Sequence, residues 1–146
     1  MTPYDVWMKV EELDETALES VTRLWEHVGL TRPWNDPRED FRRALRGARS
    51  SVLGAFDEEQ LVGTAMVGAD GHRGWVYYLA VAPSHQRRGI GRLLMQSAER
   101  WLADRDVPKV QLMVRDTNTV AVGFYERLGY DNSHTIVLGR WLGEVR

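Results

Sequence analysis

The chain has 146 residues, no cysteine, four histidines and a formal net charge of -2 at pH 7. A chain of this length buries a sizeable core by itself, and the lack of cysteine excludes disulfides, thiolate nucleophiles and cysteine-ligated zinc. Since both signs of charge are spread along the chain, we expect no broad surface for nucleic acid. No apolar run is long enough to cross a membrane, and the start carries no signal-peptide pattern. Residues 1–146 are therefore expected to form a single cytoplasmic domain.

The first half of the chain predicts a strand, two helices and a hairpin. The pattern Thr16-x-x-Glu19 is typical of a capping box and predicts a helix that Gly29 ends. Asp36 is expected to cap a second helix, because proline follows it at the first helical position. Two apolar runs then flank a polar turn, as in an antiparallel hairpin. The strands expected in this half are 6–13, 50–56 and 60–68.

The second half alternates between strands and helices. The segment 74–83 is apolar on both faces, which is typical of a central strand covered on both sides. Apolar residues then repeat at helical spacing from Ile90, and a later helix is ended by Gly129. Further strands are expected at 107–116 and 134–142. The order β-α-α-β-β-β-α-β-α-β predicts an α/β (α+β) fold, with a mixed sheet and helices on both faces.

The turn before Ile90 is rich in glycine and arginine. The first N–H groups of a helix lack intrahelical partners and attract anions, and Gly89 and Gly91 would let a phosphate approach them. Arg87, Arg88 and Arg92 add positive charge. The same residues are also compatible with an ordinary glycine-containing turn with solvated arginines. The turn lacks the Gly-Lys-Ser/Thr of nucleotide P-loops and the third glycine of the dinucleotide fingerprint.

Two segments carry a resemblance to a known family. The string Gln86-Arg87-Arg88-Gly89-Ile90-Gly91 resembles motif A of the GNAT superfamily of N-acetyltransferases, Gln/Arg-x-x-Gly-x-Gly/Ala. The segment 116–130, DTNTVAVGFYERLGY, is similar to motif B, in which an asparagine opens a helix and Phe-Tyr-x-x-x-Gly-Tyr/Phe ends it. The element order also resembles the GNAT fold, whose mainly antiparallel sheet contains a splayed central pair of parallel strands. Within the superfamily, YERLGY and LTRPWNDP resemble the bacterial YpeA-like branch.

The resemblance implies a donor site for acetyl-coenzyme A as co-substrate, with no metal. Amides of the motif A turn would hold the pyrophosphate, and the central strand would hold the pantetheine arm. The residues implied to bind the coenzyme are Leu79, Ala80, Val81, Gln86, Arg87, Arg88, Gly89, Ile90, Gly91, Arg92, Asn118 and Tyr125. Asn118 is equally compatible with a simple helix cap.

Tyr125 is the residue that the resemblance implies to be catalytic, as the general acid for the thiolate leaving group. It also lies at the edge of an apolar helical stripe, where a partly buried packing aromatic is the alternative. The general base stays open, because Trp75 stands where many GNAT enzymes have a glutamate. Candidates are Asp70 and His72 nearby in sequence, Tyr77 or Tyr78 through an ordered water, and Asp36 across the cleft.

The resemblance implies that the acceptor meets the loop between the first two helices and the strand-end loops. The residues implied there are Trp25, Arg32, Trp34, Asn35, Asp36, Arg73 and Trp75. An arginine, an indole and an amide suit a small polar amine or a peptide end. Asp36 as a helix cap and Trp34 as a packing wedge are the structural alternatives.

Two functions follow from these observations. The first is an N-acetyltransferase that moves an acetyl group directly from the thioester to a primary amine of a small molecule or peptide/protein terminus, since no cysteine can carry it. The alternative is a non-catalytic protein of the same fold that binds acyl-coenzyme A as a sensor or interaction module. The expected partner is an amine acceptor, without nucleic acid, membrane or metal, and a homodimer is compatible with the family.

Overall fold

The computed structural model describes residues 8–143, and backbone contacts divide the chain into two compact units, Met1–Leu112 and Met113–Arg146. The elements of the first unit are β1 Met8–Glu12, η1 Glu15–Ala17, α2 Leu18–His27, α3 Pro37–Arg46, β2 Ser50–Asp57, β3 Gln60–Ala69, β4 Gly74–Val81, η2 Pro83–His85, α4 Ile90–Ala103 and β5 Val110–Leu112. The second unit contains α5, Thr119–Arg127. A single domain over 1–146 stays a prediction.

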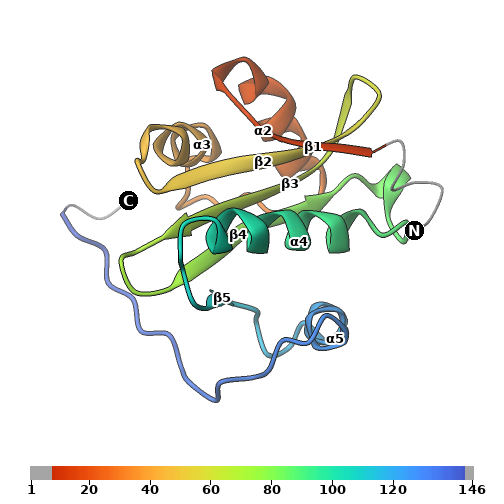
Figure 1. The fold of residues 1–146 in the computed structure, drawn as a ribbon. Helices are drawn as coiled ribbons and strands as arrows, with labels where there is room; N and C mark the ends of the chain where they lie inside the picture. Colours follow the sequence, from red (N-terminus) through yellow and green to blue (C-terminus); the bar gives the residue numbers. More distant parts are fainter. Residues whose placement is uncertain (1–7, 144–146) are drawn as a thin grey trace. The chain divides into compact units, whose positions relative to one another are not determined.

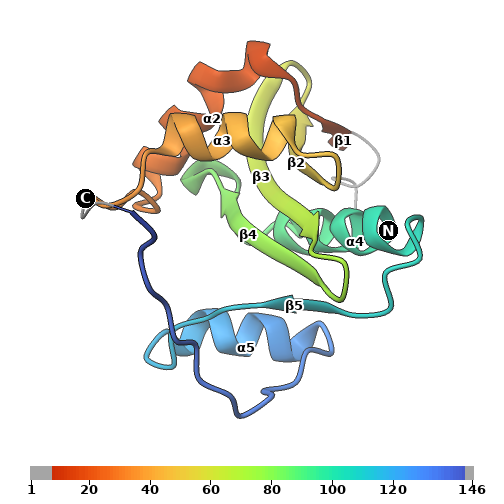
Figure 2. The same cartoon turned by 90° about the vertical axis from the view of Figure 1, so that its left-hand side faces the viewer.

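The first unit is built on a five-stranded sheet in the order β1-β2-β3-β4-β5 (Figure 1). Neighbours from β1 to β4 are antiparallel, whereas β4 and β5 are parallel. Helices α2 and α3 cover one face of this sheet and α4 covers the other (Figure 2). The predicted mixed, mainly antiparallel sheet between helices is therefore confirmed. Among the helices described, none is both long and apolar enough to span a membrane.

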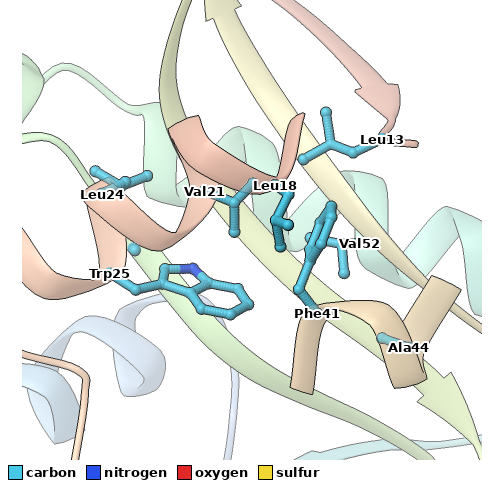
Figure 3. Close-up of a cluster of buried hydrophobic side chains, with 9 residues drawn as sticks. Leu13, Leu18, Val21, Leu24, Trp25, Phe41, Ala44 and Val52 are labelled. Carbon is cyan, nitrogen blue, oxygen red and sulfur yellow. The ribbon is translucent and has the colours of Figure 1, made fainter. Parts of the chain in front are cut away.

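A buried cluster of apolar side chains joins α2 and α3 to the sheet (Figure 3). Its members are Leu13, Leu18, Val21, Leu24, Trp25, Phe41, Ala44, Val52 and Ala80. Trp25 and Phe41 are fully buried, and each large side chain of this kind stabilises the fold by about 1.5–3 kcal/mol. This cluster fixes the two helices against the strands that lead to the site.

Helix α4 packs closely on the opposite face of the sheet. A Cβ atom on Gly63 of β3 would lie 2.9 Å from Leu94 Cδ1 and 3.2 Å from Ile90 Cγ2. The same Cβ would be 3.0 Å from the Ala80 carbonyl oxygen of β4. Glycine at this position therefore lets the first turn of α4 lie directly beside the ends of β3 and β4.

Local signals place most helix ends correctly. The Asp36 side chain accepts the backbone N–H groups of Arg38 and Glu39 and caps α3, as predicted. Gly29 follows α2 with a φ of 75°, which confirms the predicted end of that helix.

The start of the first helix differs from the prediction. Asp14, and not Thr16, is the capping residue, and its carboxylate accepts both the backbone N–H and the hydroxyl of Thr16. Helix α2 itself begins at Leu18 without a side-chain cap. The capping-box prediction fails because the chain enters α2 through a 3-10 turn that places Thr16 inside the turn.

The last predicted strand, 134–142, is not formed in the described part of the second unit. Ile136, Leu138 and Leu142 are largely exposed in this segment. Alternating apolar residues make a strand only when a neighbouring strand supplies backbone hydrogen bonds. The described residues of this unit contain no strand, and in the five-stranded sheet of the first unit the parallel pair β4–β5 lies at the edge and not in the centre.

Candidate functional site

The turn between β4 and α4 has an unusual backbone. Arg87 has a φ of 64° and Gly89 a φ of 81°, both in the left-handed region. Left-handed residues in a turn are typical of nests, in which successive backbone N–H groups point toward one anion. A Cβ atom on Gly89 would meet nothing within 4 Å, so its glycine meets a conformational need and not a steric one.

The same turn leads into the uncapped N-terminus of α4. No side chain caps the helix, and the first helical hydrogen bond runs from the Leu93 N–H to the Gly89 carbonyl oxygen at 3.0 Å. The N–H groups of Ile90, Gly91 and Arg92 thus have no acceptor within the helix, and the helix dipole makes this end positive. The predicted motif A residues lie together in one turn with the chemistry of a phosphate site.

Side chains tie this turn to the sheet. The Gln86 amide donates to the Val81 carbonyl oxygen at 3.1 Å. His85 is buried, with Nε2 2.9 Å from Asp57 Oδ2 and Nδ1 2.7 Å from Ser84 Oγ. Sequence reasoning missed His85 and Asp57, because residues 28 positions apart show no spacing signal. Within 8–143, no three His, Asp or Glu side chains are grouped to hold a metal.

Strand β4 is splayed from its parallel neighbour. It pairs with β5 only from Gly74 to Val76. On its other side Met66 of β3 pairs with Tyr77 while Thr64 pairs with Ala80, so β4 contains one extra residue, a bulge. In the described part of the chain, β5 therefore does not pair with 79–81, where the Val81 carbonyl oxygen accepts the Gln86 amide instead. This splay agrees with the predicted parallel pair and leaves polar backbone groups for an extended ligand.

Trp25 does not lie where the sequence predicted it. Its exposed fraction is 0%, so it cannot line an open acceptor mouth. The indole stacks on the Tyr78 ring, with ring centroids 3.8 Å apart, and its N–H donates to Thr64 Oγ1 at 2.9 Å. Trp25 lies on the apolar face of α2 and is therefore buried in the core, where it packs against Tyr78 of β4.

The loop between α2 and α3 keeps the other predicted acceptor residues at the surface. Trp34 has an exposed fraction of 46%. The Arg32 guanidinium donates at 2.8 Å to two carbonyl oxygens of the same loop, and the Asn35 N–H donates to the Arg32 carbonyl oxygen. Asp36 is held by its capping bonds. Trp34 thus keeps an exposed indole surface that is open to a ligand.

The hairpin loop between β3 and β4 holds Asp70 as a strong acceptor. Its Oδ1 atom accepts the backbone N–H groups of Arg73 at 2.7 Å and His72 at 2.8 Å, and Oδ2 accepts the Trp75 indole N–H at 3.0 Å. These bonds lower the pKa of Asp70 to about 2. Asp70 is therefore a very weak base at neutral pH, and it engages the Trp75 indole N–H.

In the second unit, Asn118 and Tyr125 lie on α5. Asn118 Oδ1 accepts the Ala121 N–H at 3.1 Å and caps the helix. The Tyr125 ring packs edge-on against Phe124 and Tyr130, with centroids 5.0 and 5.8 Å away. Burial raises the pKa of Tyr125 to about 12, so the phenol keeps its proton at neutral pH. A protonated phenol is the form that a general acid needs.

Comparison with known protein families identifies the family of this chain. The model of the "Acetyltransferase (GNAT) family" matches residues 10–130. The chain belongs to the GNAT acetyltransferase family. "Acetyltransferase YE1169" of Yersinia enterocolitica is 41% identical over 135 residues, which make up 92% of this chain and 96% of that protein. The predicted family and its acyltransferase class are confirmed.

Solved structures with the GNAT fold are also similar to this chain. AAC(6')-Iy in complex with the bisubstrate analogue CoA-S-monomethyl-acetylneamine has a TM-score of 0.81 at 16% identity, covering 93% of this chain and 99% of that one. The ribosomal-protein-S18-alanine N-acetyltransferase from Escherichia coli has a TM-score of 0.74 at 22% identity, covering 86% and 79%. These identities are low, so the two GNAT structures show a shared fold.

Proposed function

We propose that this GNAT protein uses acetyl-coenzyme A and transfers the acetyl group directly to a primary amine of a small molecule or of a peptide or protein terminus. The observation that carries the proposal is the turn 86–92, with left-handed Arg87 and Gly89 and an uncapped helix start, which follows the stretch 79–81 that β5 does not pair. A pyrophosphate matches the charge and N–H groups of the turn, and an amide-bearing arm matches a strand edge. The neighbour bound to a coenzyme A conjugate supports the same donor.

The proposed reaction gives each part of the chain one task. Backbone N–H groups of 79–81 hold the thioester carbonyl oxygen as negative charge develops on it. The nitrogen of the neutral amine bonds to the carbonyl carbon, the carbon–sulfur bond breaks, and Tyr125 Oη gives its proton to the leaving sulfur. The proton that the amine nitrogen loses passes to water, and water returns a proton to the Tyr125 phenolate. With no cysteine in the chain, no acetyl-cysteine intermediate can form, which supports direct attack.

A second candidate is a non-catalytic acyl-coenzyme A-binding protein of the same fold. The observation that favours it is the lack of a base on β4, whose residues 74–81 include no carboxylate. Trp75 stands in the place of the usual glutamate, and the nearby Asp70 has its pKa lowered to about 2 by its hydrogen bonds. A chain without a proton acceptor for the amine would bind the donor and not turn it over.

A thiol-release assay separates the two functions. Acetyl-coenzyme A is incubated with amino acids, polyamines, aminoglycosides and alanine-terminated peptides, the last two because proteins with similar structures are named for such acceptors. Acceptor-dependent release supports the transferase. Thermal stabilisation by acetyl-coenzyme A without thiol release across the panel supports the binding protein. If neither thiol release nor thermal stabilisation is observed, both proposed functions are contradicted.

The acceptor residues are proposed to be Arg32, Trp34, Asn35, Asp36, Arg73 and Trp75. Among them, Trp34 offers an exposed indole to a protonated or neutral amine. Trp34→Ala should raise the KM for the acceptor while the KM for acetyl-coenzyme A stays unchanged. An unchanged acceptor KM in this variant would remove Trp34 from the site.

A further inference from the structure

Tyr78 occupies the bulge of β4 in a conformation that tyrosine seldom adopts. Its φ is 51°, in the left-handed region, where the side chain crowds the backbone. Such a conformation persists only where surrounding contacts fix it. Tyr78 directly precedes 79–81, so the contacts that fix it also set the direction of the proposed donor edge.

Two buried residues, Trp25 and Thr64, contact Tyr78 on its core side. The Trp25 indole of α2 stacks on the Tyr78 ring with an interplanar angle of 14°. The Thr64 hydroxyl of β3 donates to the Tyr78 carbonyl oxygen at 2.9 Å, while it accepts the Trp25 N–H at the same distance. Both side chains are fully buried, so water does not compete for these bonds.

Asp40 of α3 holds the far end of the same side chain. The Tyr78 hydroxyl donates to Asp40 Oδ2 at 2.7 Å, within the range of a charge-assisted hydrogen bond. Since Asp40 and Tyr78 lie 38 positions apart, this bond connects the helical layer to the bulge. The Tyr78 ring is thereby fixed at its face, at its backbone and at its hydroxyl.

We propose that Asp40 is a positioning residue for the donor, which acts through Tyr78 to keep the left-handed bend of β4. The inference rests on the proposed function of 79–81 as the edge that receives acetyl-coenzyme A. If Tyr78 returned to the β region, the bulge would be lost, and Leu79 and Ala80 would exchange faces. Ala80 would then leave the core, and the edge would no longer present the same N–H groups.

The test measures coenzyme A binding, which needs no knowledge of the acceptor. Dissociation constants are determined by titration calorimetry for the full chain, Asp40→Ala, Tyr78→Phe and Asp40→Asn. Losing a hydrogen bond to a charged group should weaken coenzyme A binding about tenfold in the first two variants. Asn keeps an acceptor oxygen, so Asp40→Asn should bind within about threefold of the unchanged chain.

Glu39→Gln is the matched control on the same helix. Glu39 pairs with Arg46 on the surface of α3 and not with β4. This variant should lose the exposed ion pair with Arg46 but keep the coenzyme A affinity. All titrations are made roughly 10 °C or more below the unfolding midpoint of each variant, so that global unfolding does not cause the loss of affinity.

Backbone amide exchange at 79–81 provides a readout that does not depend on binding. Faster exchange in Asp40→Ala, restored in Asp40→Asn, supports the positioning role. Equal coenzyme A affinity in Asp40→Ala and Glu39→Gln, or no recovery in Asp40→Asn, overturns it and leaves the proposed function intact. If the unchanged chain does not bind coenzyme A, the proposed function fails, and exchange alone decides the role of Asp40.

Discussion

The Nε2 atom of His85 lies 2.9 Å from Oδ2 of Asp57, and this contact joins the turn before α4 to the end of β2. His85 has an exposed fraction of only 8%, so the imidazole is part of the packed structure. A turn that is held in place before a ligand arrives loses less conformational entropy on binding. The contact is therefore expected to preorganise the proposed pyrophosphate site.

His85→Ala should weaken coenzyme A binding by roughly tenfold, the order expected when a buried hydrogen-bonded pair loses one partner. Titration calorimetry measures this change. His27→Ala is the control, because His27 is exposed in the last turn of α2. Equal affinities of the two variants would show that the turn keeps its conformation without this contact.

Gly89→Ala should weaken coenzyme A binding because alanine disfavours a φ of 81° by about 1–2 kcal/mol. Gly71→Ala is a matched control, since Gly71 has a φ of 92° and also leaves open space for a Cβ atom. Both variants should lose similar free energy of unfolding in urea. Coenzyme A affinity should fall only in Gly89→Ala, and an equal fall in both would point to a general loss of structure.

Tyr125→Phe should lower kcat by about a hundredfold, which is the lower range for a lost general acid, and leave coenzyme A affinity nearly unchanged. Steady-state kinetics with the acceptor found in the release assay measure kcat, and calorimetry measures affinity. Phe124→Leu is the control for packing beside the same ring. Full activity of Tyr125→Phe would exclude the acid role.

The raised pKa of Tyr125 also predicts an alkaline loss of stability. Its pKa is about 12 in the folded chain and 10.0 ordinarily, so folding favours the protonated phenol. The stabilisation is complete below pH 10 and declines as the pH rises from about 10 to 12. Urea unfolding at pH 9, 10 and 11 should show a decline in the unchanged chain that is smaller in Tyr125→Phe.

Asp70 has the opposite linkage. Hydrogen bonds lower its pKa from 3.8 to about 2, so folding favours the carboxylate. The stabilisation is present above pH 4 and declines as the pH falls toward 2. Asp70→Asn should be less stable than the unchanged chain at pH 6 in urea unfolding, and the difference should shrink by pH 2.5. A constant difference across this range would mean that the charge of Asp70 does not stabilise the hairpin.

Local sequence patterns were sufficient to predict the turn before α4 and most helix ends. Gly89, Asp36 and Gly29 act on backbone groups within a few residues of themselves, so their roles are visible in a short window of sequence. The resemblance to motif A agrees with this local chemistry. Burial of Trp25 is different, because an indole on an apolar helical stripe suits both a core and a surface mouth.

Contacts between distant residues could not be read from the sequence. The pairs His85–Asp57 and Tyr78–Asp40 depend on which elements become neighbours in the sheet and the layer above it. The prediction of a strand at 134–142 was wrong for a related reason. Alternating apolar residues indicate one apolar face, but they do not supply a neighbouring strand for the backbone hydrogen bonds. Strand and site predictions therefore hold best where the hydrogen bonds close locally.

The extra residue in β4 changes how the strand must be read. Gly74 meets Leu102 of α4, so even-numbered positions there face α4, whereas Ala80 belongs to the cluster beneath α2 and α3. The parity of the strand thus reverses between Tyr77 and Ala80. Removing one residue from the bulge would restore regular alternation and keep Ala80 on the face toward α2 and α3. An ungapped alignment of β4 with a relative that lacks the bulge would therefore equate side chains on opposite faces of the sheet after Tyr77, even where the residues are identical.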